Sequence, residues 1–386
     1  MSEQTGRAPI VLQVLPDLDG GGGVERGTID IARALVQAGW GAVVASNATR
    51  LAGRIDALGG RHVRLPLHSK NPFVMAANIR RLKRLIEEAG VDIVHARSRA
   101  PAWCAYYAAR ATRRHFVTTV HGTHGTRVPL KRAYNAIMTR GERVIAISNF
   151  IADRIVRHHA VDRSRIRIIP RGVDLDQFTP RAVSADRIVG LSRRWRLEDG
   201  APVVMLPGRL TTWKGHDLLI EAMARVRADA CCVMVGNGTD AQSFVETMLG
   251  RAAALDLASR VRFVGRCDDM PAAYMLADVV VSASRRPEAF GRVAAEAQAM
   301  GVPVVATDHG GARETVLAGL TGWLVPPGDA AAMARAIDEA LSLDAEERAR
   351  RAAAARAHVE ANFSLRAMCE RTLAVYREVL EGGPGG

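Results

Sequence analysis

The chain has 386 residues, 48% of them hydrophobic. This length exceeds that of one ordinary domain and suits two domains. Its five cysteines lack the close pairs typical of metal or redox sites, so a reducing compartment is expected rather than a disulfide-stapled secreted fold. The formal net charge is +13, and the excess lies in residues 1–190, which hold 30 Lys and Arg against 15 Asp and Glu, whereas residues 191–386 hold 23 against 25.

The first half alternates strand-like and helical segments. A β-rich run at residues 10–15 is followed by the glycines at 20–23 and by apolar residues at helical spacing over 24–38. Further strand-like runs, separated by helical segments such as 76–89, lie at residues 41–46, 62–65, 93–96, 116–120 and 143–147. Strands that alternate with helices predict a parallel, doubly wound sheet.

The pattern restarts near residue 200, after a polar, arginine-rich stretch from Asp174 to Gly200. Strand-like runs lie at residues 202–206, 231–235, 262–264, 279–282 and 302–306, and the last three helical segments at 329–343, 345–362 and 365–380 have no strands between them. We therefore predict two Rossmann-like domains, residues 1–190 and 191–364. The C-terminal helix at about 365–381 is a candidate to pack back on the first domain.

The glycines at 20–23 follow the first strand, where doubly wound sheets bind ligands and backbone N–H groups can approach a phosphate. The cluster is not GxGxxG, and no acidic residue ends the second strand to hold a ribose. Binding of NAD is therefore disfavoured. A turn without a ligand is the alternative, because a glycine cluster alone is a weak signal.

Two cations, Arg209 and Lys214, follow the first strand of the second half. At a strand's carboxyl end both can reach one pyrophosphate. When a glycosyl–phosphate bond breaks, the departing diphosphate gains negative charge, and fixed cations stabilise that transition state more than the ground state. Lys214 is one of four lysines beside 49 arginines, which favours a compact ammonium at this position. Surface charges near a helix start are the alternative interpretation.

Two glutamates mark the stretch 287–306: Glu288 precedes a predicted helix, and Glu296 lies within it among alanines. A carboxylate in so apolar a helix is costly to bury without a polar partner, and ligand hydroxyls would be such a partner. If the segment is helical throughout, the carboxylates are ~12 Å apart, too far for a simple acid–base pair. We expect them to grip different parts of one long ligand.

The basic first half is expected to attract an anionic membrane surface or an acidic acceptor, and a merely solvated basic surface is the alternative. Aromatic content is 5%, without a basic stretch interleaved with aromatics, so nucleic acid is not expected as a partner. No run approaches the ~18–20 apolar residues needed to span a bilayer. We expect a cytoplasmic protein, peripheral at most at the inner face of the cytoplasmic membrane.

Together these motifs resemble the retaining glycosyltransferases of family 4. The resemblance rests on Glu288 and Glu296 with the segments 301–305 and 310–314, on Arg209 with Lys214, and on motifs spread over nearly the whole chain: Gly22-Gly23-Val24-Glu25, His121-Gly-Thr-His124 and Pro170-Arg-Gly-Val-Asp174. It implies an α/β GT-B fold, in which two facing Rossmann-like, doubly wound domains flank a deep cleft. The N-terminal domain would bind the acceptor and the C-terminal domain a nucleotide sugar.

The resemblance also implies roles for individual residues. Arg209 and Lys214 would bind the diphosphate, Glu288 the transferred sugar and Glu296 the ribose, and we predict Arg209, Lys214, Glu288 and His121 as the catalytic residues. The other implied positions are Arg266 beside the base, Gly22 and Gly23 in the glycine loop, Phe290, Gly291, Arg292 and Val293 as backbone donors, and Glu25, His124 and Ser148 on the acceptor side. The chain departs from relatives at Arg171, where asparagine is common, and at Arg292, where many are aliphatic.

We therefore predict a retaining, hexosyltransferase-like enzyme that moves a sugar from a nucleoside-diphosphate donor, with a UDP-sugar preferred, to a cell-envelope, lipopolysaccharide or lipid-linked glycan. No cofactor and no metal are expected, because the cations and helix dipoles would replace a divalent ion. A GT-B-like phosphorylase, a sugar-nucleotide epimerase and a non-catalytic nucleotide-sugar or membrane-binding module are the rival hypotheses. One architecture hosts several such chemistries.

Overall fold

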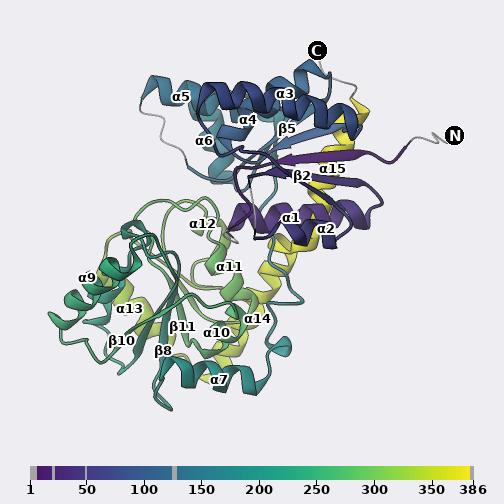
Figure 1. Cartoon of the computed structure of the whole chain (residues 1–386). Helices are drawn as coiled ribbons and strands as arrows, with labels where there is room; N and C mark the ends of the chain where they lie inside the picture. Colours follow the sequence, from purple (N-terminus) through teal and green to yellow (C-terminus); the bar gives the residue numbers. More distant parts are fainter. Residues whose placement is uncertain (1–6, 20–21, 48–49, 124–127, 383–386) are drawn as a thin grey trace. The chain divides into compact units, whose positions relative to one another are not determined.

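The structure is a computed structural model and describes residues 7–19, 22–47, 50–123 and 128–382. The chain forms two compact units, one of residues 1–172 and 365–386 and the other of residues 173–364 (Figure 1). It passes from one unit to the other twice, after Gly172 and after Ser364. Each unit contains a parallel sheet with helices on both faces.

The first unit is built on a seven-stranded sheet. Its strands are β1 (Ile10–Val14), β2 (Gly41–Ser46), β3 (Arg61–Arg64), β4 (Ile93–Ala96), β5 (His115–Val120), β6 (Arg143–Ala146) and β7 (Ile166–Ile168). Its α-helices are α1 (Gly23–Gln37), α2 (Ala52–Ala57), α3 (Pro72–Glu88), α4 (Arg99–Ala111), α5 (Pro129–Asn135), α6 (Asn149–His159) and α15 (Leu365–Glu381). The strands pair in parallel in the order β3-β2-β1-β4-β5-β6-β7, so the winding reverses between β1 and β4.

Helix α15 packs in the core of this first unit, although it is the last helix in the chain. Its Tyr376 is fully buried with Leu35 of α1 and Val11 of β1, and its hydroxyl lies 2.7 Å from Nδ1 of His95 in β4. Helices α1, α2 and α15 cover one face of the sheet, and α3 to α6 cover the other (Figure 1). Helix α15 is amphipathic because its apolar face packs against the first sheet and its polar face is exposed.

The second unit repeats the design with six strands. Its strands are β8 (Val203–Pro207), β9 (Cys231–Val235), β10 (Val261–Gly265), β11 (Val279–Ser282), β12 (Val304–Thr307) and β13 (Trp323–Val325). Its α-helices are α7 (Ala185–Trp195), α8 (His216–Met223), α9 (Ala241–Ala253), α10 (Met270–Leu276), α11 (Arg292–Ala299), α12 (Ala312–Thr315), α13 (Ala330–Leu341) and α14 (Ala345–Phe363). The parallel order β10-β9-β8-β11-β12-β13 reverses between β8 and β11.

The division of the chain differs from the predicted boundary at residue 190. The first unit ends at Gly172, because the arginine-rich stretch that follows is folded onto the second unit. Helix α7 within it buries Leu191 and Trp195 and packs against α10, and the ring of Phe178 lies 6.1 Å from that of Tyr274. Polar composition alone therefore misplaced the boundary.

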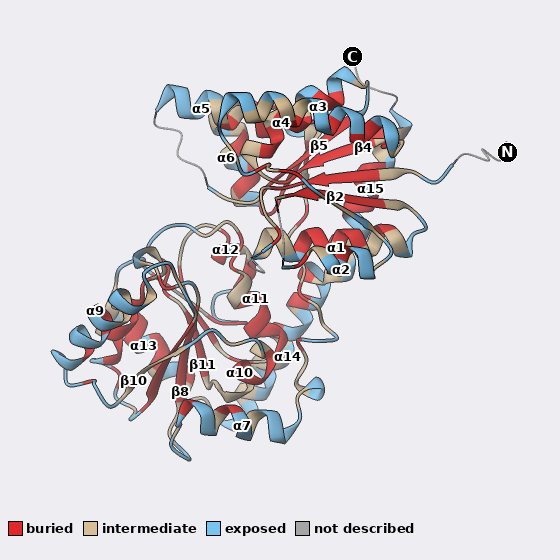
Figure 2. Ribbon diagram, in the orientation of Figure 1, coloured by how far each residue is buried: buried red, intermediate tan, exposed pale blue. Residues whose placement is uncertain are grey.

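The predicted doubly wound architecture of both halves is confirmed, and each predicted strand lies within two residues of an observed one. The strands could be predicted because the central strands of both sheets are buried, whereas the outer sides of the helices are exposed (Figure 2). The prediction missed β7 and β13, which are three residues long and lie at sheet edges. No helix in the described part of the chain combines the length and apolar character needed to cross a membrane.

Candidate active site

The strands β8 and β11 end at the switch point of the second sheet. The loop after β8 carries Arg209 and a 3-10 turn at Thr212–Lys214, and the loop after β11 carries Glu288 before α11 begins at Arg292. Doubly wound sheets bind ligands at this point, because the loops from the two central strands turn toward opposite faces of the sheet. The fold thus brings the predicted cations and carboxylates to one edge.

Gly215 allows the β8 loop to pack closely against the end of β11. Its φ is +75°, and a Cβ atom there would lie 1.9 Å from the carbonyl oxygen of Ala283. Only glycine combines this left-handed backbone with so close a contact. The packing places Lys214, the preceding residue, beside Glu288.

The ammonium of Lys214 binds the carboxylate of Glu288, with 2.8 Å between Nζ and Oε1. The two side chains are 14% and 15% exposed, so the ion pair is largely shielded from solvent. The hydroxyl of Ser284 donates to the same carboxylate oxygen, and Nζ of Lys214 lies 4.6 Å from the centre of the Trp213 ring. The charge of Glu288 is therefore held by a cation and a hydroxyl from two different loops.

Burial by itself would raise the pKa of the Glu288 carboxyl, but the charge and hydrogen bond of Lys214, the hydroxyl of Ser284 and the nearby His309 outweigh it. The pKa consequently lies below its ordinary value, and Glu288 is ionised at neutral pH. An ionised carboxylate only accepts hydrogen bonds. Glu288 can therefore receive hydroxyl groups of a sugar while it orients Lys214.

The backbone at Glu288 is fixed by the loop that follows β12. The N–H of Gly311 donates to the carbonyl oxygen of Glu288 at 2.9 Å. Gly310 has φ of +61°, and a Cβ atom there would lie 2.5 Å from that same oxygen. The glycine pair thus lets two loops at the carboxyl edge of the sheet meet without side chains between them.

Glu296 lies in α11 with only 6% of its surface exposed. The hydroxyl of Tyr274 donates to Oε2 at 2.9 Å, and Nε of Arg292 lies 3.0 Å from Oε1. Two protein groups thus supply the polar partner that the buried carboxylate was expected to need, so its burial alone does not require a ligand. A carboxylate has about four acceptor positions, so capacity for further hydroxyl groups is left.

The other predicted donor-side residues differ in environment. The side chain of Arg209 is exposed, and none of the described residues engages its guanidinium. Arg266 pairs with Asp268 at 2.7 Å on the surface. Phe290 is buried edge-on against Phe363, so only its backbone can face a ligand.

Gly291, with its φ of +96°, precedes α11, whose first residues are Arg292 and Val293. No side chain of the described residues caps this helix, and the earliest residue in it whose N–H bonds back to Gly291 is Ala294. The N–H groups of Arg292 and Val293 are therefore available to an anion, which the helix dipole favours at this end.

In the first unit the predicted residues lie at the carboxyl ends of the strands. Gly22 is the N-cap of α1, and a Cβ atom there would lie 2.6 Å from Oε2 of Glu25, which places this carboxylate over the start of its own helix. Gly23 is the first residue of the same helix.

His121 directly follows β5. Ser148 is buried and its hydroxyl accepts the N–H of Ile151, so it caps α6. His124 lies outside the described residues.

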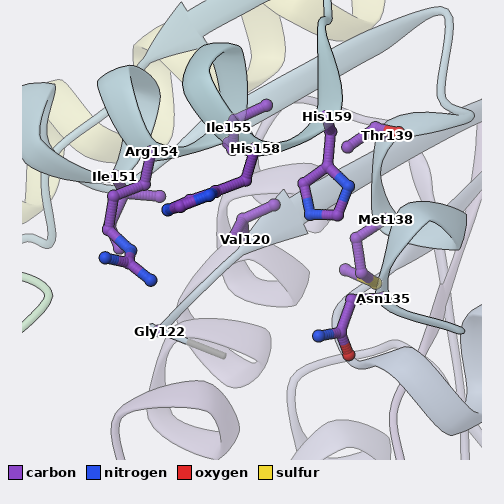
Figure 3. A pocket seen from close by; sticks show the side chains of 10 residues that line it. All are labelled: Val120, Gly122, Asn135, Met138, Thr139, Ile151, Arg154, Ile155, His158 and His159. Carbon is purple, nitrogen blue, oxygen red and sulfur yellow. The ribbon is translucent and has the colours of Figure 1, made fainter. Parts of the chain in front are cut away.

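A small hollow of about 40 Å³ is lined in part by Gly122, the residue after His121. Figure 3 shows Arg154, His158 and His159 of α6 around it, opposite Asn135. Burial, with the charges of neighbouring arginines such as Arg132, lowers the pKa of both histidines, so they are neutral at pH 7. The hollow has room for about one water molecule or a few, and not for a sugar.

Sequence reasoning missed Ser284, His309 and Tyr274. Ser284 and His309 come two residues after β11 and β12, so a search for polar residues beyond the ends of predicted strands would have found both. Tyr274 lies in the apolar helix α10, and nothing in the sequence marks it as the partner of Glu296. Among the described residues, no three His, Cys, Asp or Glu side chains group so as to hold a metal ion.

Comparisons with known proteins identify the family of the chain. The family model described as "Glycosyltransferase Family 4" matches residues 21–177, and that described as "Glycosyl transferases group 1" matches residues 191–358. A solved glycosyltransferase from Rickettsia africae is 36% identical with a TM-score of 0.90, and the match covers 97% of this chain and 99% of that one.

Two curated relatives show the same likeness. The chain is 33% identical to a D-inositol 3-phosphate glycosyltransferase from Xylanimonas cellulosilytica, over 73% of this chain and 70% of the relative. It is 33% identical to a GDP-mannose-dependent alpha-(1-6)-phosphatidylinositol monomannoside mannosyltransferase from Mycolicibacterium smegmatis, over 74% and 75%. In three further relatives with the former name the match spans 52%, 54% and 56% of the relative's length. The two family models, the fold and the near-complete structural match together show that the chain belongs to glycosyltransferase family 4, in the group 1 glycosyl transferases with the GT-B fold.

Proposed function

We propose that the chain transfers a sugar from a nucleoside-diphosphate donor to a hydroxyl of its acceptor with retention of anomeric configuration, and that the second unit binds the donor. The observation that carries the proposal is the Lys214–Glu288 pair at the switch point between β8 and β11. Nucleotides bind at such points in doubly wound sheets. Membership of the family supports retention.

The diphosphate is assigned to Arg209, Lys214 and the N-terminal end of α11. Arg209 stands exposed on the same loop as Lys214, and its guanidinium is unengaged by the described residues. Positive charge fixed at the phosphate nearest the sugar stabilises the leaving group as its bond to the anomeric carbon breaks. The departing phosphate is then placed to accept the proton of the attacking hydroxyl on the same face of the sugar.

Hydroxyl groups of the donor are assigned to the two carboxylates. Glu288 faces the transferred sugar, since it sits beside the ammonium that binds the diphosphate. Glu296 holds the ribose, oriented by Tyr274 and Arg292. Arg266 is assigned to the base. His121 belongs to the other unit, and its catalytic assignment rests on the family resemblance alone, as does that of Gly22.

We infer that the reaction needs no divalent ion, because Arg209, Lys214 and the N-terminal end of α11 would together supply positive charge to the diphosphate. Transfer should then proceed at an unchanged rate in the presence of a chelator. A rate that falls by more than about tenfold with chelator and returns with Mg²⁺ would point to metal-assisted departure of the diphosphate instead.

The donor nucleotide has two candidates. A UDP-sugar is our first proposal, and the GDP-mannose-dependent relative favours the second, GDP-mannose. For the acceptor, a cell-envelope, lipopolysaccharide or lipid-linked glycan is proposed, and the printed names of the relatives favour an inositol phosphate or a phosphatidylinositol glycan within that range.

A membrane-bound acceptor would be met at the inner face of the cytoplasmic membrane, and the first unit has a surface suited to it. Phe73 of α3 is 86% exposed and Leu130 of α5 is 81% exposed. Exposed arginines and Lys83 follow on α3 over residues 80–84. Apolar side chains beside cations favour an anionic bilayer. Binding to anionic liposomes should weaken with salt, and binding that ignores lipid charge would remove this part of the proposal.

The experiment is a thermal-shift screen of UDP, GDP and ADP, followed by transfer of label from the matching sugar nucleotides to a bacterial envelope extract. A shift with one diphosphate, together with label transfer that depends on the extract, supports the proposal. Label released as free sugar phosphate only when inorganic phosphate is added identifies a phosphorylase. Nucleotide binding without transfer to any acceptor identifies a non-catalytic module.

A further inference from the structure

We propose that a basic hollow in the first unit binds the phosphate group of a phosphorylated acceptor, through Lys70, Arg99 and Lys131. The inference rests on the proposed function, in which this unit holds the acceptor. It adds the place in this unit, and the residues, that would select a phosphorylated acceptor. The hollow has a volume of about 760 Å³, within the range of pockets for small ligands.

The hollow lies at the switch point of the first sheet. Pro16 follows β1, the residues Ser98–Ala100 follow β4, and Thr123 follows β5, and all of them line it. The winding of this sheet reverses between β1 and β4, so the position corresponds to that of the Lys214–Glu288 pair in the second sheet. The fold therefore offers a ligand site here for the same topological reason.

The lining is basic. Lys70 comes from the loop between β3 and α3, Arg99 from the first turn of α4, and Lys131 from α5, and His68 lies with them. Among the described residues that line it there is no aspartate or glutamate. Cations that converge from three separate elements on one hollow favour a multiply charged anion, because a single carboxylate would leave most of their charge uncompensated.

Two of the four lysines of the chain form ion pairs. Of the four, Lys83 pairs with Glu87 and Lys214 with Glu288. The other two are Lys70 and Lys131, and within the described residues neither has an ion-pair or hydrogen-bond partner. Both unpaired ammonium groups thus lie at the same hollow, where an anion would neutralise them.

Arg99 is oriented for binding. Its Nη1 donates to Oδ1 of the buried Asn135 at 2.8 Å, which fixes one edge of the guanidinium and leaves other N–H groups to the hollow. Ser98 precedes α4 without a side-chain cap, and Ala100 lines the hollow beside it. The uncapped N–H groups of this 13-residue helix add the positive end of its dipole.

Tyr134 gives the hollow a flat wall. Its ring stacks on Trp103 with the centroids 6.0 Å apart, and the indole N–H of Trp103 donates to the Tyr134 carbonyl oxygen at 3.3 Å. An aromatic face held in this way suits the apolar face of a sugar or polyol ring. The geometry therefore fits a phosphorylated sugar or polyol, either as a free phosphomonoester or as the phosphodiester headgroup of a lipid.

The test uses the full chain saturated with whichever of UDP or GDP it binds, so that the donor site is closed to phosphate. Isothermal titration compares inorganic phosphate, D-inositol 3-phosphate and unphosphorylated inositol. Flotation compares phosphatidylcholine vesicles with and without phosphatidylinositol. The variants are Lys70→Ala, Lys131→Ala and Arg99→Gln, and Arg335→Ala, which removes an exposed cation on α13 of the second unit, is the control.

We expect inositol 3-phosphate to bind at least about tenfold more tightly than inositol, and each lysine variant to lose about five- to tenfold of that affinity, since each removes one charge-assisted hydrogen bond. Arg335→Ala should match the wild type. Capture by phosphatidylinositol vesicles that Lys70→Ala abolishes assigns the phosphate to a lipid headgroup, whereas binding of the soluble phosphates alone assigns it to a free phosphomonoester.

The inference is overturned if neither phosphate probe nor the vesicles distinguish Lys70→Ala and Lys131→Ala from the control. Both lysines are exposed, so these variants are expected to fold even where Arg99→Gln does not. Failure of the donor proposal has a different signature, because no nucleoside diphosphate would then bind. Nucleotide binding without discrimination for phosphate overturns the present inference alone.

Discussion

Replacing Lys214 by methionine removes the ammonium and keeps most of the side chain's length, so it isolates the charge that binds Glu288. With 2.8 Å between Nζ and Oε1, the Coulomb energy is on the order of 6 kcal/mol at an effective dielectric constant of about 20. Desolvation of two side chains that are 14% and 15% exposed offsets much of it. Because the variant leaves a shielded carboxylate without its cation, we expect the free energy of unfolding to fall by about 2–4 kcal/mol.

Urea denaturation followed by tryptophan fluorescence measures this loss. Glu288→Gln in the same background removes the uncompensated charge, so the double variant should be more stable than the sum of the single effects by about 1–3 kcal/mol. The pair between Arg285 and Asp217 is a control, since it is more exposed and breaking it should cost less than about 1 kcal/mol. A Lys214→Met variant within about 0.5 kcal/mol of the wild type, or strictly additive effects, would refute the reasoning.

The same substitution tests the assignment of the diphosphate. At a temperature where the variant is folded, Lys214→Met should lower kcat at saturating donor by about 100-fold or more, because the lost charge acts mainly on the departing diphosphate. Steady-state kinetics with the identified donor provide the measurement. Weak donor binding with full kcat at saturation would contradict the transition-state assignment.

Three further predictions concern residues that support the site: His216, Gly215 and Tyr274. Burial lowers the pKa of His216 from 6.5 to about 4, so below pH 6.5 the unfolded chain binds a proton that the folded chain excludes. Acidification from pH 7 to about pH 4.5 should therefore lower the free energy of unfolding by about 2–3 kcal/mol through this residue. In urea titrations His216→Gln should remove this part of the pH dependence. Gly215→Ala should cost at least about 2 kcal/mol in the same assay, since its Cβ would meet the Ala283 carbonyl oxygen at 1.9 Å, and a neutral effect would show that the loop relaxes freely. Tyr274→Phe should cost about 1–2 kcal/mol by removing a donor from Glu296, and should weaken nucleotide binding with little change in kcat.

The fold was predictable because two sequence patterns recur along the chain: short apolar runs typical of buried strands, and apolar residues at helical spacing. Buried runs such as those of β1 and β8 are almost entirely apolar, and amphipathic helices separate them. The domain boundary was not predictable from composition, since only the packing of Trp195 and Phe178 shows that the polar stretch belongs to the second unit. The edge strands β7 and β13 are too short to give a periodic signal.

The contacts among the predicted site residues could not be read from the sequence. Lys214 and Glu288 were predicted separately, but their pairing depends on the close approach that Gly215 permits, and no sequence spacing encodes an approach of two loops. The partners of Glu296 are Arg292, one turn earlier in the same helix, and Tyr274, 22 residues earlier in another helix, and the sequence pattern around Glu296 does not indicate the second. The basic hollow escaped notice because its cations come from three elements far apart in the chain.

The most direct test of the central claim is a crystal structure of the full chain with its nucleoside diphosphate bound. We predict that the diphosphate lies at the ends of β8 and β11, within about 3.2 Å of Nζ of Lys214, with Arg209 on its other side and the ribose hydroxyls at Glu296. A nucleotide bound elsewhere in the molecule, with the Lys214–Glu288 pair in place and untouched by ligand, would contradict the account.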